Sequence, residues 1–168
     1  MNATILQGNP AGLSDYRQSL GCFGTGVALV SCLAPDGRAL ALTINSFTSV
    51  SLVPPLTLWC IGDSSTVYDV FANADHYAIN ILGLAGRPLS ERFSKPSVHE
   101  LADHEYVAAP SGAPWVKSAI AHIDARTWRR DRVGDHLVIY GETMAFHSQA
   151  EGEGLGYFRG RYTAISRS

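Results

Sequence analysis

Short strand-like runs separated by turn residues dominate this sequence, and they limit the folds that it can adopt. Residues 25–34 (TGVALVSCLA) and 76–82 (HYAINIL) are apolar and rich in β-branched side chains over the length of one strand. We count about six or seven such runs and only two or three short segments with helical spacing. Because a doubly wound parallel sheet needs a long helix between successive strands, the sequence predicts a mainly β fold, a small antiparallel barrel with helices inserted at its edge.

The boundaries of the expected elements follow from caps and turns. Ser14 caps a short helix that Gly24 ends, and Pro54 and Pro55 stop a long extended run. We expect helices over 14–23, 64–74 and 87–94, a loop or lid over 97–116, and strands over 25–34, 39–52, 56–62, 76–82, 119–133 and 136–148. Residues 157–165 are expected to be a last strand or an extended arm. Residues 1–13 are expected to form a flexible N-terminal arm, and residues 14–168 a single domain.

The charge balance excludes two classes of partner. The chain has 13 Lys and Arg against 15 Asp and Glu, so no basic excess draws it to nucleic acid or to an anionic membrane. Arg129, Arg130 and Arg132 form only a local cluster, which Asp131 interrupts, and this is typical of a solvated face. The N-terminus has no signal-peptide pattern and no apolar run reaches about 18 residues, so we expect a cytoplasmic protein with no membrane segment.

The charged fraction also bears on assembly. Asp, Glu, Lys and Arg make up 17% of the chain, against about a quarter in ordinary globular domains. We therefore expect that a partner covers part of the surface, most simply a second copy of the chain.

The cysteines and histidines do not suggest a disulfide framework or a metal site. Cys22, Cys32 and Cys60 are odd in number and form no C-x-x-C pair, so reduced thiols in a reducing compartment are expected. His99 and His104 lie five residues apart, which turns them away from a shared helix face, and no zinc site is expected. The fingerprints of dinucleotide-binding, phosphate-loop and nucleophile-elbow proteins are also absent from the sequence.

Three segments carry the chemistry, and the first is 43–51 (TINSFTSVS). A strand normally alternates polar and apolar side chains, yet hydroxyl and amide groups occupy both faces of this one. Such a surface lets a flat polar ligand approach the backbone and offers donors and acceptors for ring carbonyls and an imide N–H. The alternative is an ordinary edge strand rich in Ser and Thr.

The second segment is 63–70 (DSSTVYDV). Ser64, Ser65 and Thr66 are expected to open a helix, where unpaired backbone N–H groups and three hydroxyls would form a phosphate site. Arg92 and Lys95 would add positive charge. The alternatives are ordinary helix capping and two surface cations.

The third segment is 133–142 (VGDHLVIYGE). Gly134 permits a tight turn, Asp135 fixes it, and His136 enters the strand that follows. A histidine at this position either packs as a satisfied ring or lines a cleft, where it gives a hydrogen bond or a flat surface to a nicotinamide.

These segments, in this order and at this spacing, resemble the flavin reductase-like family, which includes the reductase components of two-component flavin-dependent monooxygenases. The matching stretches are GCFGTGVALVS, TINSFTSVSLVPPL, the SST turn, HYAINIL, LSERFS, VGDHLVIYGE and the closing YFRGRY, so the resemblance covers about 16–163. The chain departs from the family at Val53, where relatives usually have Asp before the proline pair. That change removes no flavin contact.

The resemblance implies an antiparallel split β-barrel of Greek-key type with a few short helices at its rim. It implies a homodimer with FMN or FAD at the subunit interface, with NADH or NADPH as electron donor and a separate oxygenase that receives the diffusing reduced flavin. It also implies site residues by position. These are Thr43, Asn45, Ser46 and Thr48 at the flavin ring or ribityl chain, Ser64, Ser65 and Thr66 at the phosphate, Phe93, Ser94 and Lys95 at the phosphate end or nucleotide, His136 beside the nicotinamide, and Tyr162 closing the site.

The expected reaction is therefore hydride transfer from C4 of the nicotinamide to N5 of the flavin, with His136 as a positioning group first. The protein would stack the two rings near attack distance, and donors at the pyrimidine edge would stabilise the arriving negative charge. Two alternatives remain open. One is a flavoprotein that reduces another acceptor, such as a quinone, ferric chelate or cobalt corrin. The other is a non-catalytic flavin-binding or redox-sensing protein.

Overall fold

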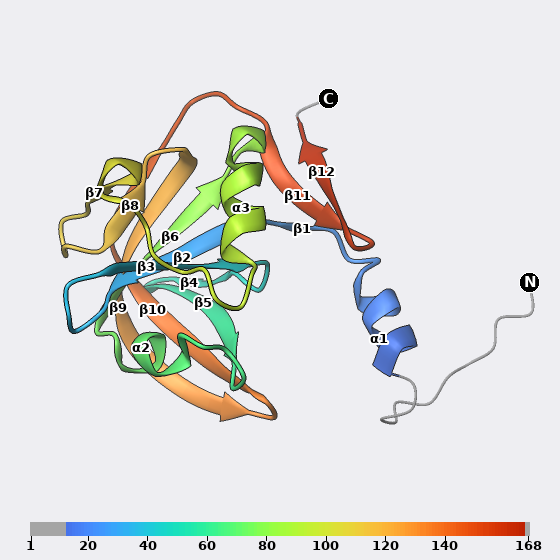
Figure 1. Ribbon diagram of the computed structural model, residues 1–168, viewed down its shortest axis with the longest axis horizontal. Helices are drawn as coiled ribbons and strands as arrows, with labels where there is room; N and C mark the ends of the chain where they lie inside the picture. Colours follow the sequence, from blue (N-terminus) through green and yellow to red (C-terminus); the bar gives the residue numbers. More distant parts are fainter. Residues whose placement is uncertain (1–12, 167–168) are drawn as a thin grey trace, which may run out of the picture.

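A seven-stranded antiparallel sheet forms the centre of the molecule in the computed structural model, which describes residues 13–166 (Figure 1). Its strand order is β3-β2-β6-β9-β10-β5-β4. The strands of this sheet are β2 (Ala28–Leu33), β3 (Ala39–Ile44), β4 (Thr48–Leu52), β5 (Pro55–Gly62), β6 (His76–Leu82), β9 (Ala119–Val133) and β10 (His136–Ser148). The prediction of a mainly β chain with few short helices is confirmed.

Smaller elements surround this sheet. A three-stranded sheet has the order β1-β11-β12 and a two-stranded sheet pairs β7 with β8. Their bounds, with those of the helices, are α1 (Leu13–Leu20), β1 (Thr25–Gly26), α2 (Tyr68–Asn73), η2 (Leu84–Gly86), α3 (Arg87–Phe93), η3 (Asp103–Glu105), β7 (Tyr106–Ala108), β8 (Pro114–Val116), β11 (Gly154–Phe158) and β12 (Arg161–Ile165). In Figure 1, α1 projects beyond β1 and β12, away from the main sheet.

The two edge strands of the main sheet are consecutive in the sequence, and this shapes the sheet. β3 ends at Ile44 and β4 begins at Thr48, so the connection spans at most about 15 Å. The sheet must therefore curl until its edges approach each other. Within the described residues no ladder joins β3 to β4, so the sheet is not closed as a barrel. The extended run expected over 39–52 is broken at 45–47, where the chain crosses between the edges.

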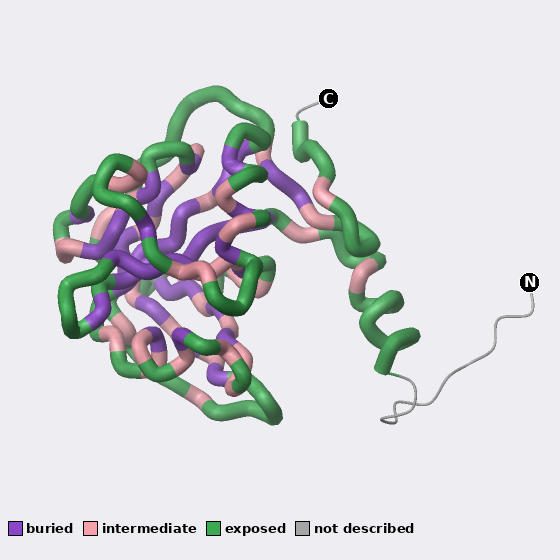
Figure 2. Tube along the Cα trace, in the orientation of Figure 1, coloured by how far each residue is buried: buried purple, intermediate pink, exposed green. Residues whose placement is uncertain are grey.

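Two apolar clusters hold the sheet. The larger one contains Trp59, whose ring meets Phe71 at 5.5 Å and Tyr77 at 5.6 Å between centroids, both edge-on. The second cluster lies under α3 and includes Phe93 and Leu155. Figure 2 shows the buried residues concentrated in the strands of the main sheet and the exposed residues along α1 and β12. Aromatic side chains contribute most of the buried area in such cores, and their edge-on contacts add to it.

The strands expected over 76–82, 119–133 and 136–148 are confirmed with the same bounds. Two other expectations need correction. The segment 97–116 is not a free loop or lid, because it contains η3 and the β7–β8 hairpin. Residues 157–165 belong to a second hairpin, β11–β12, whose turn has Arg159 and Gly160 at positive φ.

The β7–β8 hairpin is attached to the main sheet by a buried amide. Asn80 is fully buried in β6, and its Oδ1 accepts a hydrogen bond of 2.8 Å from the backbone N–H of Val116. Its Nδ2 donates to the Leu29 carbonyl and to the Ser31 hydroxyl. A buried amide with all of these partners fixes one arrangement of the two sheets. Of the expected N-terminal arm, residues 1–12 lie outside the described residues.

Candidate functional site

A groove of about 360 Å³ lies where the end of β3 meets the turn after β5 and the end of α3. We call it the inner groove. Nine of the site residues expected from the sequence line it: Thr43, Asn45, Ser46, Ser64, Ser65, Thr66, Ser94, Lys95 and His136. They come from four separate parts of the chain, so the fold brings together the three segments that the sequence singled out.

A larger space of about 730 Å³ continues from the inner groove, and we call it the outer groove. The two share the wall formed by 43–45 and 94–95. Tyr162, a further expected site residue, lines the outer groove with Arg87 and Arg161. Arg87 pairs with Glu91 at 2.7 Å, whereas Arg161 and Lys95 have no carboxylate partner among residues 13–166. The outer groove therefore presents uncompensated positive charge beside the inner one.

A chain of hydroxyl groups links β3 to α3 and β12. The Thr43 hydroxyl donates a 2.8 Å hydrogen bond to the Ser90 carbonyl. Ser90 is fully buried in α3, and its own hydroxyl lies 2.7 Å from the Tyr162 hydroxyl. The Thr43 proton is thus already used, and its oxygen can only accept from a ligand. Tyr162 is held further by an edge-on contact of 5.4 Å with the Tyr157 ring.

In the crossover at 45–47, the Asn45 amide has no hydrogen-bond partner among the described residues, whereas the Ser46 hydroxyl is hydrogen-bonded. Asn45 is exposed at the groove. The Ser46 hydroxyl accepts a 3.0 Å hydrogen bond from the Cys60 N–H and also contacts the Cys60 carbonyl. Ser46 therefore fastens the crossover to β5, while Asn45 offers a donor and an acceptor to a ligand. Burial raises the pKa of the Cys60 thiol, which keeps it neutral in the wall.

The segment 64–66 is a turn before α2 and not the first turn of the helix, which corrects the expectation. The helix begins at Tyr68, and the Tyr68 N–H bonds to the Ser65 carbonyl. Ser64 is exposed, and its N–H has no backbone acceptor among the described residues. The Thr66 hydroxyl donates to the Pro96 carbonyl, which ties this turn to the end of α3. The turn still offers Ser64 and Ser65 hydroxyls beside the Lys95 ammonium, as an anion site requires.

His136 lines the inner groove at the start of β10, beside the turn that follows β5. It pairs with Gly62 in the ladder, and a Cβ at Gly62 would lie 3.6 Å from its Nε2. Its Nδ1 contacts the Asp135 carboxylate at 2.7 Å, and this hydrogen bond lowers the pKa of Asp135. The carboxylate orients the ring and leaves Nε2 free to face the groove.

Two expected site residues do not line either groove. Phe93 is fully buried in the second apolar cluster, under the Arg92 guanidinium, so its side chain is not available to a ligand. Thr48 lies on β4, beyond the crossover, and its hydroxyl contacts the neighbouring Ser49 carbonyl. Phe93 anchors the end of α3 and thereby places Ser94 and Lys95.

The sequence did not single out His99, Arg87 or Arg161 for the site. His99 lines the inner groove and Arg161 the outer one. A histidine in a segment without periodicity and an arginine near the C-terminus carry no local signal. Only the pairing of β11 with β12 and the docking of 96–101 on β3 bring them to the groove.

Residues 13–166 contain neither a metal-binding cluster nor a helix that could cross a membrane. No group of three or more His, Cys, Asp or Glu side chains is arranged to hold a metal ion in that part of the chain. None of the helices described there is long and apolar enough to cross a membrane. The three cysteines are free thiols, and burial raises the pKa of Cys32 to about 12.

The geometry suits a flat polar ring with an anionic tail. The ring edge would meet Thr43 and Asn45, the anion would meet the 64–66 turn and Lys95, and His136 lines the same groove. Pockets of about 300–1,000 Å³ are the usual size for such ligands. The outer groove adds room and cationic charge for a second nucleotide portion.

Comparison with known families gives one match. The sequence matches the family described as "Flavin reductase like domain" over residues 20–166. It is 37% identical over 150 residues to the reductase subunit of stachydrine N-demethylase from Rhizobium meliloti, covering 89% of this chain and 65% of that protein. It is 34% identical to an NADH-dependent FMN reductase from Agrobacterium fabrum, covering 91% of this chain and 86% of that protein.

A solved structure agrees with these matches. The NADH:FAD oxidoreductase of Streptomyces globisporus, in complex with NAD and FAD fragments, superposes with a TM-score of 0.87 at 28% identity. The match covers 96% of this chain and 98% of that one. The chain spans 65% of the length of the first curated relative and about half of the length of two others, a reductase component from Acinetobacter baylyi and a second protein from Rhizobium meliloti.

Proposed function

The chain belongs to the flavin reductase-like domain family, and from this premise we propose that it is an NAD(P)H:flavin oxidoreductase. It transfers a hydride from NADH or NADPH to FMN or FAD and supplies the reduced flavin to a separate monooxygenase. Relatives named as NADH-dependent FMN and FAD reductases and as monooxygenase reductase components support this assignment.

One observation carries the proposal: the inner groove joins three kinds of group in a single wall. It has the amide of Asn45 at the end of β3, the hydroxyl turn at 64–66 with Lys95, and His136 at the start of β10. A flavin has a hydrogen-bonding ring edge at one end and a phosphate at the other, so the groove matches it at both ends.

We assign the residues accordingly. Thr43 and Asn45 bind the flavin ring or ribityl chain, Ser64 and Ser65 with Lys95 bind its phosphate, and the outer groove receives the rest of a dinucleotide. Ser46, Ser94 and Thr66 shape these surfaces through their hydrogen bonds to the neighbouring backbone. Tyr162 lines the outer groove.

When both are bound, the nicotinamide supplies the hydride and the flavin accepts it. The chain's own residues bind and orient the two rings. His136, oriented by Asp135, holds the nicotinamide through Nε2, and the Asn45 amide is placed to donate where negative charge arrives on the ring. No other protein group has to form a bond during the transfer.

We also propose that the chain acts as a homodimer, with one domain over 14–168 and a curled sheet that forms an open, split barrel. The edge strand β4 leaves Leu52 86% and the following Val53 92% exposed. The helix α1 buries none of its residues among those described. Apolar groups on an edge strand and on an isolated helix are typical of surfaces that a partner covers. A cytoplasmic location fits three cysteines that are all free.

The test is a direct assay of the purified protein with each donor and each flavin. Addition of NADH or NADPH together with FMN or FAD is expected to cause rapid loss of nicotinamide absorbance under anaerobic conditions. A yellow protein that oxidises neither donor would favour a flavin-binding or sensing role. Turnover only with an added quinone, ferric chelate or cobalt corrin would favour a reductase of that acceptor. A colourless, inactive protein would contradict all of these functions.

A further inference from the structure

His99 makes hydrogen bonds to β3 with both its backbone and its ring. The Ala41 N–H donates a 2.7 Å hydrogen bond to the His99 carbonyl. In return, Nδ1 of the His99 ring lies 3.1 Å from the Ala41 carbonyl. Because a carbonyl only accepts, Nδ1 carries the proton in this contact. His99 thus provides partners for both the N–H and the carbonyl of Ala41, which lies two residues before Thr43 in β3.

The other end of the ring meets the two turns that form the anion site. Nε2 of His99 lies 3.0 Å from the Thr66 hydroxyl and 3.1 Å from the Pro96 carbonyl. The Thr66 hydroxyl itself donates to Pro96, so three groups from three segments meet at one point. We call 64–66 together with 94–96 the phosphate seat. His99 is the side chain that contacts β3 at one end and both halves of the seat at the other.

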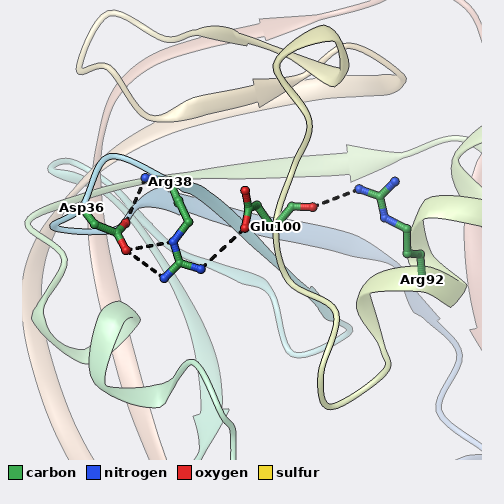
Figure 3. Close-up of polar contacts among 4 residues, drawn as sticks. All are labelled: Asp36, Arg38, Arg92 and Glu100. Carbon is green, nitrogen blue, oxygen red and sulfur yellow. Dashed lines mark hydrogen bonds and ion pairs between the residues drawn. The ribbon is translucent and has the colours of Figure 1, made fainter.

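The backbone that follows His99 is fixed at Glu100 and Leu101, so the ring has little freedom. Figure 3 shows the Glu100 side chain against Arg38, which also pairs with Asp36, and the Glu100 carbonyl accepting from Arg92. Leu101 donates a 2.9 Å hydrogen bond to the Ala39 carbonyl. The ring is therefore held in place before any ligand arrives, which is what positioning requires.

From these contacts we propose that His99 is a positioning residue that sets the distance between the phosphate seat and the ring-binding end of β3. The proposal rests on the proposed function, because it assumes that a flavin lies between Asn45 and Lys95. The Thr66 hydroxyl gives its proton to the Pro96 carbonyl, and its oxygen lies 3.0 Å from Nε2 of His99. Thr66 and His99 therefore act as a pair that aligns the seat, and Ser64, Ser65 and Lys95 make the direct contacts with the phosphate.

Riboflavin and FMN differ only in the phosphate, so their affinities separate the two ends of the groove. In His99→Ala we expect the dissociation constant for FMN to rise about tenfold, the loss of about 1.4 kcal/mol of hydrogen bonding. The constant for riboflavin is expected to stay within about twofold, because riboflavin does not use the seat. Thr66→Val should weaken FMN in the same way, and the double variant should be no worse than either single one.

Two further variants guard against a simple folding defect. His99→Asn places an amide N–H where Nδ1 stands, so it keeps the contact with Ala41 and loses the contacts with the seat. It should fold like wild type and still lose FMN affinity. His104→Ala is the matched control, because His104 is an exposed histidine of the same segment outside the groove. It should leave both affinities and the melting temperature unchanged.

The experiment is fluorescence or calorimetric titration of each variant with FMN and riboflavin, beside a thermal melt. Selective loss of FMN affinity in His99→Asn supports the proposal. Equal losses for FMN and riboflavin, or no loss for either, overturn it. Wild-type protein that binds riboflavin and FMN equally would show that the seat takes no phosphate, which also overturns it. Wild-type protein that binds none of riboflavin, FMN and FAD would contradict the proposed function itself.

Discussion

At the scale of single residues, His136 is the side chain on which nicotinamide use is expected to depend. Its ring is oriented by Asp135 and lines the inner groove next to Gly62, which precedes the phosphate seat in the chain. We expect His136→Ala to raise the KM for NADH about tenfold, because it removes the contact between the imidazole and the nicotinamide. The dissociation constant for the flavin should stay within about twofold, because the Asn45 and Lys95 ends remain intact.

The measurement is steady-state kinetics with varied NADH, together with flavin titration of the same preparation. His76→Ala is a suitable control, because His76 is an exposed histidine at the start of β6 that lines neither groove. An equal loss of flavin binding and nicotinamide use in His136→Ala would contradict the assigned role.

Gly141 gives a second prediction at this scale, on stability. A Cβ added to Gly141 would overlap the Tyr77 hydroxyl and lie 2.8 Å from Tyr77 Cζ. Tyr77 is fully buried between Trp59 and β10, so neither side can move away. We expect Gly141→Ala to lower the free energy of unfolding by about 3 kcal/mol, the upper range for overpacking.

Chemical denaturation at fixed protein concentration measures this cost. Tyr77→Phe should partly rescue Gly141→Ala, since it removes the atom that clashes most. Alone it should cost little, because the Tyr77 hydroxyl has no hydrogen-bond partner among the described residues. A Gly141→Ala protein as stable as wild type would show that β10 can shift at this position.

At the scale of elements, one ion pair ties η3 to α3. Arg92 of α3 makes two hydrogen bonds of 2.6 and 2.7 Å with the Glu105 carboxylate, which is only 13% exposed. The same carboxylate accepts from the Ala102 N–H. These hydrogen bonds hold the pKa of Glu105 below its usual value, and those from Arg92 have the largest effect.

The lowered pKa of Glu105 predicts how stability depends on pH. The ionised carboxylate is favoured in the folded state, so its contribution is full above the unfolded pKa and is lost as pH falls through the lower folded pKa. We expect Glu105→Gln to cost about 2 kcal/mol at pH 7. The difference from wild type should shrink between about pH 5 and pH 3. Urea denaturation over this range checks it, with exposed Glu151→Gln as the control, and a gap that stays constant with pH would contradict it.

Sequence and structure agree best where one face of an element is buried in a regular ladder. Residues 76–82, 119–133 and 136–148 are predicted with the observed bounds because turn residues such as Gly83 and Gly134 mark where the strand-like runs stop. The helix expected over 64–74 starts four residues late, at Tyr68. Capping residues mark both turns and helix starts, so Ser64 to Thr66 could not distinguish the two.

Only the site residues that belong to a local sequence motif could be predicted from the sequence. The hydroxyl-rich strand end and the Gly-Asp-His turn carry a local signal, and the fold brings both into one groove. His99 and Arg161 carry none, because tertiary pairing alone places them. Phe93 is the converse case. It is followed in the sequence by two residues that line the groove, but its own side chain at the end of α3 is buried in the core.

At the scale of the whole molecule, the curled sheet determines which surface a partner would cover. β3 and β4 join at the groove, so a second copy that covers β4 would border the site. The unpaired edge of β4 and the exposed Leu52 and Val53 favour such pairing, because edge strands with apolar side chains readily add another chain. Assembly and flavin binding are then coupled, since a ligand that bridges two copies stabilises the pair.

This coupling gives the last prediction. Light scattering at micromolar concentration should give a mass of about twice 18.1 kDa for wild type. Replacing Leu52 and Val53 together by Lys should return the mass to that of one chain, because burying two ammonium groups costs several kcal/mol. Val107→Lys is the matched control, since Val107 is 50% exposed on β7, outside this edge. The double variant should also bind FMN more weakly, whereas a wild-type mass of one chain at every concentration would exclude the dimer and leave the groove to bind flavin alone.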